Sequence, residues 1–201
     1  MRDGEEVVAP LIDWAVAARP CAGETESGDA CVVKDFPHAA LIAVVDGLGH
    51  GAEAARAARA AIAVVESSTT PSLSQIATAC HSVLRETRGA AMTLVCIGRD
   101  GTMSWLGIGN VSAVLIRRSD TEGRDVIVSR GGLVGNQLPS VAPTTLSVFP
   151  GDTLVITTDG VRWDPHDEVA LLMELEPTAR ELIDQYAITT DDALVVVARC
   201  R

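Results

Sequence analysis

The chain has 201 residues, of which 47% are hydrophobic and 21% charged, the composition of a globular protein with a packed core. A disordered chain, a collagen-like chain and a small disulfide scaffold are therefore excluded. Asp and Glu outnumber Lys and Arg by 27 to 16, for a net charge of −11, and because such a surface repels polyanions we expect no nucleic-acid partner.

The first half of the chain predicts three strands followed by two helices. Apolar residues bounded by polar ones indicate strands at residues 12–18 and 30–34, and a continuous apolar run at 40–45 indicates a buried strand. The Ala-rich residues 52–66 favour a helix. A second helix is predicted at residues 72–88, where apolar residues recur at helical spacing.

The second half of the chain is dominated by predicted strands. In chain order these lie at residues 92–97, 103–108, 112–116, 126–129, 153–158 and 193–198. Residues 131–147 show no period and are predicted to be mostly loop. A helix is predicted at residues 168–186, which Pro177 is expected to break or restart. The helices cluster between runs of hairpin-linked strands, so the fold class is α+β, and residues 1–201, which contain no linker segment, are expected to form a single domain.

The sequence shows no sign of membrane insertion or secretion. No apolar run approaches the about 18 residues that span a bilayer, and residues 1–6 lack the basic and apolar regions of a signal peptide. The cysteines, widely spaced and without a C-x-x-C pair, are Cys21, Cys31, Cys80, Cys96 and Cys200. We therefore expect reduced thiols in a cytoplasmic protein, with no disulfide frame, no zinc site and no membrane partner.

Acidic residues stand at the ends of the predicted buried strands. They are Asp46, Asp159, the pair Asp191 and Asp192, and, before the second strand, Glu24 with Asp29. Any one of them alone is typical of a turn, but together they would repel one another unless a cation lies between them. Carboxylates with no His or Cys cluster nearby select hard ions such as Mg²⁺ or Mn²⁺. Two such ions would generate a hydroxide nucleophile and hold a phosphoryl oxygen.

These acidic residues belong to an ordered set of short motifs. In chain order the motifs are Ser27-Gly28-Asp29, Asp46-Gly47-Leu48-Gly49-His50-Gly51, Gly107-Ile108-Gly109-Asn110, Pro150-Gly151-Asp152-Thr153-Leu154, Thr158-Asp159-Gly160-Val161 and Asp191-Asp192-Ala193. Over about residues 21–200 the set resembles the metal-dependent PP2C-type (PPM) serine/threonine phosphatases. It is most similar to their bacterial sporulation and general-stress branch, which includes the small phosphatase that resets the stressosome.

The resemblance implies a four-layer α-β-β-α sandwich with two central antiparallel sheets and two Mn²⁺ or Mg²⁺ ions at one end. It implies that Asp46 bridges the ions, that the carbonyl of Gly47 binds one of them, that Asp159 and Asp191 ligate the other, and that Asp29 holds metal-bound water. Asp192 is expected to lie outside the ligand set.

The activity implied by the resemblance is hydrolysis of phosphoserine or phosphothreonine on a stress-signalling or partner-switching protein. A metal-bridging hydroxide would attack phosphorus, with Asp46, Asp159 and Asp29 as the catalytic set. One alternative is a catalytically weak binding module of the same fold that reads a phosphorylated partner. A second is an ATP-binding kinase of the GHKL type, which would require a helix with an Asn ligand before Asp46, where only strands are predicted.

The sequence departs from the family pattern at the position where eukaryotic relatives carry an arginine that binds substrate phosphate. Glu24 occupies that position here, and Arg19 is a candidate replacement. His50, in the DGLGHG motif, is expected to pack or cap at the start of the Ala-rich helix rather than to transfer protons. The turn at residues 107–110 is expected to support the site without supplying a ligand.

Overall fold

The computed structural model describes residues 9–118, 123–164 and 174–201. Within them lie ten strands and three helices. Their order is β1 (Ile12–Arg19), β2 (Asp29–Phe36), β3 (Ala39–Gly47), α1 (Ala52–Ser67), α2 (Leu73–Leu84), β4 (Ala90–Gly98), β5 (Thr102–Ile108), β6 (Ser112–Ile116), β7 (Arg124–Ile127), β8 (Thr144–Ser147), β9 (Thr153–Thr157), α3 (Leu175–Tyr186) and β10 (Ala193–Cys200).

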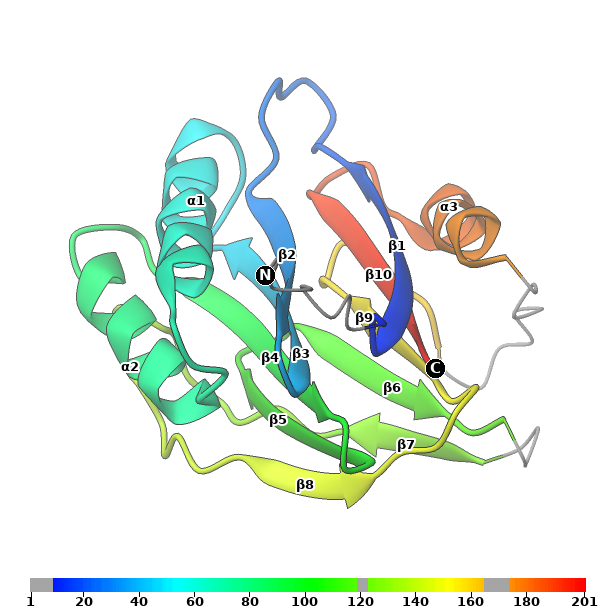
Figure 1. Ribbon diagram of the computed structural model, residues 1–201. Coiled ribbons are helices and arrows are strands. Elements are labelled where there is room, and N and C mark those ends of the chain that lie inside the picture. The colour runs from blue at the N-terminus through cyan, green and yellow to red at the C-terminus, as the bar shows by residue number, and fades with distance from the viewer. Residues whose placement is uncertain (1–8, 119–122, 165–173) are drawn as a thin grey trace, which may run out of the picture.

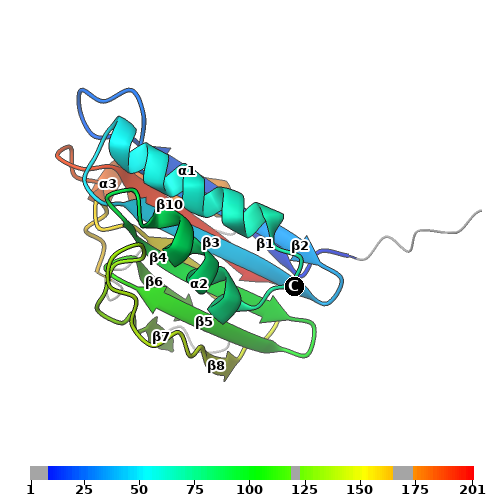
Figure 2. The same cartoon turned by 90° about the vertical axis from the view of Figure 1, so that its left-hand side faces the viewer.

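The strands form two five-stranded antiparallel sheets that stack face to face (Figure 1). One sheet has the strand order β1-β10-β9-β6-β7 and the other the order β2-β3-β4-β5-β8. Helices α1 and α2 cover the outer face of the second sheet, as Figure 2 shows from the side, and α3 packs on β1 and β10 of the first. The α+β class and the α-β-β-α sandwich predicted from the sequence are confirmed.

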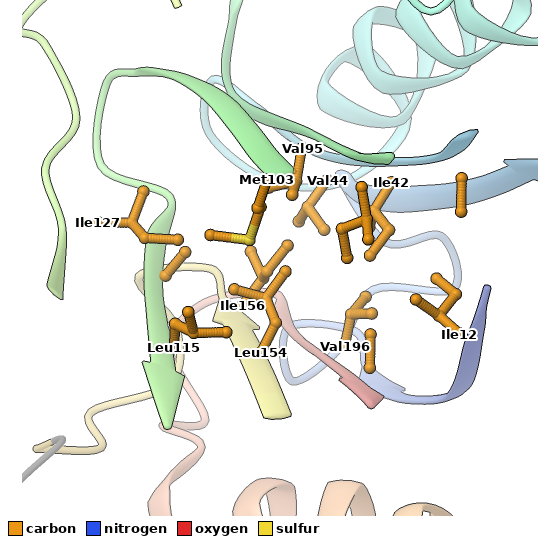
Figure 3. Close-up of a cluster of buried hydrophobic side chains, with 14 of the residues drawn as sticks. Ile12, Ile42, Val44, Val95, Met103, Leu115, Ile127, Leu154, Ile156 and Val196 are labelled. Carbon is orange, nitrogen blue, oxygen red and sulfur yellow. The ribbon is translucent and has the colours of Figure 1, made fainter. Parts of the chain in front are cut away.

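The central core lies between the two sheets and is built from aliphatic side chains (Figure 3). Ile42 and Val44 of β3 face this layer together with Ile156 of β9 and Val196 of β10, and all four are fully buried. The residues that alternate with them point outward and pack under the helices. Burial on both faces explains why these strands are continuous apolar runs in the sequence.

The structure differs from the sequence prediction in residues 131–147. Most of this segment is loop, as predicted, but residues 144–147 form the strand β8, which pairs with β5 at the edge of the second sheet. β8 consists of Thr144, Thr145, Leu146 and Ser147 and is mostly exposed. A short polar edge strand of this kind has no apolar alternation by which the sequence could reveal it.

Two predicted elements also have other bounds in the structure. The strand expected at residues 126–129 is β7, two residues earlier, and α2 ends at Leu84 rather than at residue 88. α3 begins at Leu175, so Pro177 lies in its first turn, which agrees with the expected restart, because a missing N–H there costs no helical hydrogen bond. The predicted helical residues 168–173 lie outside the described residues.

Two other predictions can be compared directly with the structure. All five cysteines are free, as predicted, and three of them are buried. In the part of the chain that the structure describes, no helix is both long enough and apolar enough to span a membrane.

The Pro150-Gly151-Asp152 motif has a structural role in the fold. Asp152 is 2% exposed and accepts hydrogen bonds from the backbone N–H groups of Phe149 and Arg118, at 3.1 and 3.0 Å. The guanidinium of Arg117 pairs with the same carboxylate at 2.9 Å. Because its partners compensate the buried charge, Asp152 can stabilise the turn before β9.

Candidate metal centre

The predicted ligand residues gather at the end of the sandwich where β3 and β9 end and β2 and β10 begin. Asp29 and Asp46 lie directly opposite each other in the β2–β3 register. Asp159 follows β9, and Asp191 precedes β10, the strand that pairs with β9. Asp46, Asp159 and Asp191 line a cleft of about 470 Å³.

Asp29 is the most deeply buried of these carboxylates, at 8% exposure. The hydroxyl of Thr158 donates a hydrogen bond to its Oδ2 at 2.7 Å, which joins the start of β2 to the end of β9. Burial, followed by the charges of Asp192, Asp159 and Asp191, raises the pKa of Asp29 to about 7 despite this hydrogen bond. The Asp29 carboxyl group therefore lacks a cationic partner among the described side chains.

Asp46 is in the same electrostatic situation. The pKa of Asp46 is raised well above its ordinary value. Burial is the largest cause, and the charges of Asp29 and Asp159 raise the pKa further. The carboxyl groups of Asp46 and Asp159 also lie close enough to interact through a hydrogen bond, which raises the pKa of Asp46 further. Burial likewise raises the pKa of Asp191. Each of these shifts is expected where negative charges converge without a compensating cation.

The turn after β5 brings Asn110 to the same cleft. Its Nδ2 donates a hydrogen bond to Oδ2 of Asp159 at 2.5 Å. Gly109 has a φ of +91°, and a Cβ there would lie 2.5 Å from Cβ of Ala91, so only glycine allows this tight approach. The sequence predicted a supporting turn but missed the direct contact with Asp159. In the sequence, only the Gly-x-Gly-Asn pattern of residues 107–110 marks Asn110, and this pattern does not indicate which side chain Asn110 contacts.

Gly47 and Gly160, which follow two of the aspartates, let neighbouring backbone approach closely. A Cβ on Gly47 would lie 2.2 Å from the carbonyl oxygen of Ala54 in α1. A Cβ on Gly160 would lie 1.9 Å from the carbonyl oxygen of Asp192. These contacts account for both glycines without a metal, so the glycines by themselves are not evidence for one.

Asp192 holds the loop between β1 and β2. Its Oδ1 accepts a hydrogen bond from the backbone N–H of Cys21 and its Oδ2 accepts one from the N–H of Gly28, both at 2.8 Å. The carboxyl group is 2% exposed and does not line the cleft. Asp192 therefore orients the segment that leads into Asp29, which agrees with its expected place outside the ligand set.

Replacing Asp192 by alanine is expected to lower the free energy of unfolding by about 3 kcal/mol, because two backbone N–H groups lose their acceptor in a buried setting. In a chain of this size such a loss lowers the thermal midpoint by roughly 6–12 °C. Thermal unfolding followed by circular dichroism measures it. The control is Asp184→Ala, an exposed aspartate in α3, and equal midpoints for the two variants would contradict the assigned role.

Two other sequence predictions at this end of the molecule need correction. His50 does not cap α1, whose N-cap is Gly51 without a side-chain hydrogen bond. Instead, its Nδ1 pairs with Oε1 of Glu24 at 2.8 Å, at the surface. Arg19 does not line the cleft, because its guanidinium donates to the backbone carbonyl oxygens of Ala187 and Ile188 at 2.7 and 3.2 Å.

The donor set suits small hard cations that keep most of their water. In residues 9–118, 123–164 and 174–201, no three Asp, Glu, His or Cys side chains form a group that could hold a metal ion alone. The carboxylates are instead adjacent in pairs, Asp29 with Asp46 and Asp46 with Asp159. Proteins bind Mg²⁺ through one or two carboxylates, with water in the remaining positions. The paired carboxylates and the raised pKa values of Asp29 and Asp46 therefore fit such ions.

Comparison with known proteins agrees with this fold. The model of the family described as Stage II sporulation protein E (SpoIIE) matches residues 37–201. The chain belongs to the SpoIIE family. The PP2C phosphatase domain of SpoIIE from Bacillus subtilis superposes with a TM-score of 0.74 at 21% identity, covering 94% of this chain and 63% of that one, so the family has the PP2C phosphatase fold.

Two other solved structures resemble this SpoIIE-family chain over nearly its whole length. One comes from work on the bacterial stressosome as a modular system adapted to control secondary messenger signalling. It is 34% identical, with a TM-score of 0.86 over 94% of this chain and 99% of that one. The other is RsbX in complex with magnesium, at 21% identity and a TM-score of 0.82 over 94% and 96%. No curated protein sequence matches the chain.

Proposed function

We propose that this SpoIIE-family chain, acting as a single domain over residues 1–201, is a Mn²⁺- or Mg²⁺-dependent protein serine/threonine phosphatase. The observation that carries the proposal is the convergence of Asp29, Asp46, Asp159 and Asp191 at the end of a PP2C fold. Bound divalent ions supply the positive charge that a phosphoryl group requires and lower the pKa of water. The magnesium complex of RsbX supports the choice of ion.

The roles of the chain's own residues follow from their positions. Asp46, which contacts Asp159 and lies opposite Asp29, would be shared by two ions, and the carbonyl of Gly47 would complete one of the sites. Asp159 and Asp191 would hold the second ion. Asp29, fixed by Thr158, would orient water by accepting its hydrogen bond, and Asn110 would hold Asp159 in place.

The wall of the cleft beyond the carboxylates suits a protein substrate. Leu48, Ala91 and Leu133 line it together with the backbone of Gly131 and Gly132, and the side chain of Leu48 is 51% exposed. Apolar side chains beside a carboxylate cluster would contact the residues that flank a phosphoserine or phosphothreonine. Three of these positions, Gly131, Gly132 and Leu133, come from the segment in which the sequence predicted mostly loop.

The proposed substrate is a phosphorylated protein of a bacterial stress-signalling or partner-switching system, in the cytoplasm. The structural neighbours support this class, because they include a stressosome-related protein, RsbX, and the RsbU and RsbW domains of a protein from Mycobacterium tuberculosis. Five free cysteines accord with a reducing compartment. The net charge of −11 disfavours a nucleic-acid partner.

Hydrolysis of p-nitrophenyl phosphate and of a phosphoserine peptide tests the proposal. We expect turnover with Mn²⁺ or Mg²⁺, a loss of at least about 100-fold in EDTA and full recovery on adding the ion back, because the cleft by itself offers a phosphate only negative charge. Circular dichroism in EDTA verifies that the protein stays folded. A folded protein that is inactive with every ion would refute the enzyme and favour a module that binds a phosphorylated partner without cleaving it.

A further inference from the structure

No basic side chain is found among the described residues that line the cleft. Its charged lining residues are Asp46, Asp159 and Asp191, and its remaining described lining residues are uncharged. His50, which is close enough to Asp191 to lower its pKa, is already paired with Glu24. A cationic side chain at the edge of the cleft would help to fix the orientation of a phosphoprotein bound there, in addition to any metal.

Arg88 places a guanidinium at that edge. It lies in the turn between α2 and β4, and its Nη1 is 3.1 Å from the position that a Cβ on Gly49 would occupy. Gly49 lines the cleft, two residues from Gly47 of the proposed metal site. Arg88 is exposed, and no hydrogen bond or ion pair of its side chain occurs within the described part of the chain. The charge of Arg88 reaches Glu53, whose pKa is lowered chiefly by Arg56 and to a smaller extent by Arg88.

The turn that carries Arg88 is held rigidly against the cleft. Oγ1 of Thr87 donates to the carbonyl of Leu84 at 2.7 Å and accepts from the N–H of Gly89 at 3.0 Å. The carbonyl of Gly89 accepts the N–H of Leu48 at 3.0 Å. Gly89 has a φ of +84°, and a Cβ there would meet the carbonyl of Val134 at 2.8 Å. The backbone of residue 88 is therefore set in place before any substrate binds.

These contacts distinguish Arg88 from the other arginines near this end of the molecule. Arg56 and Arg59 of α1 pair with Glu53 and Glu26 at 2.9 and 2.7 Å. Arg130, next to Gly131 in the cleft wall, donates to backbone carbonyl oxygens at 2.9 and 2.6 Å. Each of these guanidinium groups is occupied by the protein itself, whereas the guanidinium of Arg88 is available to a ligand.

We propose that Arg88 binds anionic oxygens of the phosphoprotein substrate and so positions the phosphate over the carboxylate cluster. The inference rests on the proposed phosphatase function and specifies its substrate site. A planar guanidinium donates two parallel hydrogen bonds to a phosphate or carboxylate, which a lysine ammonium does not reproduce. The anionic oxygens can belong to the phosphate itself or to an acidic residue beside the phosphoserine, and the experiment separates these two sources.

The test compares steady-state kinetics of wild type, Arg88→Ala and Arg88→Lys. The substrates are p-nitrophenyl phosphate and two phosphoserine peptides that differ only in neutral or acidic flanking residues. We expect Arg88→Ala to raise KM about tenfold with little change in kcat, and Arg88→Lys to recover part of the loss. A contact with the phosphate raises KM for all three substrates, whereas a contact with the flank raises KM for the acidic peptide alone.

The matched control is Arg85→Ala, which removes an equal charge from an exposed arginine at the end of α2 and is expected to leave KM unchanged. Thermal unfolding verifies that each variant is folded. For Arg88→Ala, KM values for both peptides within twofold of wild type would overturn the inference while leaving the phosphatase proposal intact.

If wild type shows no turnover, the phosphatase proposal fails. The affinity for the labelled acidic phosphopeptide, measured by fluorescence anisotropy, then decides the role of Arg88, and equal affinities of wild type and Arg88→Ala refute it.

Discussion

In an Asp46→Ala variant, kcat/KM for p-nitrophenyl phosphate and for a phosphoserine peptide is expected to fall about a thousandfold or more. Asp46 is the one described carboxylate that lies opposite Asp29 and also contacts Asp159. Its loss therefore disturbs both proposed ion positions together, and no other side chain takes its place. Excess Mn²⁺ is not expected to restore the rate, because the missing ligand belongs to the protein.

The control for this experiment is Asp35→Ala. Asp35 lies on β2, the strand that begins with Asp29, but it is exposed near the far end of that strand. Its removal changes the net charge by the same amount and is expected to leave turnover within about twofold, as is usual for surface substitutions. An Asp46→Ala variant that retained a tenth of the wild-type rate in saturating metal would show that the reaction does not depend on this carboxylate.

The second large effect concerns the stability of the metal-free protein. Replacing Asp46 by asparagine is expected to raise the free energy of unfolding in EDTA at pH 8 by about 2 kcal/mol. The thermal midpoint should rise by roughly 4–8 °C. The physical reason is that the change removes one negative charge from a buried group of mutually repelling carboxylates while keeping the shape of the side chain. Added Mg²⁺ or Mn²⁺ should stabilise wild type and have little effect on the variant.

The sign of this effect follows from the raised pKa of Asp46, which burial and the charges of Asp29 and Asp159 hold well above 3.8. A carboxyl group with a raised pKa in the folded state holds its proton to a higher pH there than in the unfolded chain. Folding stability is therefore retained below about pH 4 and lost progressively as the pH rises towards the raised pKa of Asp46. Removing the charge of Asp46 lowers the repulsion, so the advantage of the variant should appear above pH 5 and vanish near pH 4.

Unfolding of both proteins in EDTA at a series of pH values measures this difference. A constant gap between wild type and Asp46→Asn from pH 4 to pH 8 would mean that the stabilisation has another origin. A variant less stable than wild type at pH 8 would mean that the charges are already compensated within the protein. Either result would remove the electrostatic argument for cations at this site.

Much of the fold could be predicted because strands that are buried on both faces appear in the sequence as continuous apolar runs. Residues 40–45 and 153–158 are continuous apolar runs, and both became strands covered on two faces. The edge strand β8 has an exposed polar sequence and no such pattern. The boundary errors at α2 and β7 arise where solvent-exposed residues give no periodic signal, so local hydrogen bonds decide the end of an element.

In the candidate site, too, some features could be predicted from the sequence and others could not. The sequence by itself determined which acidic residues are placed at strand ends, because a buried run that stops at Asp-Gly must leave its carboxylate near the rim of a sheet. Only the tertiary structure decided that Asp29 faces Asp46, that Asn110 contacts Asp159 and that Arg88 lies against Gly49. These contacts join segments far apart in the chain, and they depend on strand register and turn geometry, which hydropathy patterns do not encode.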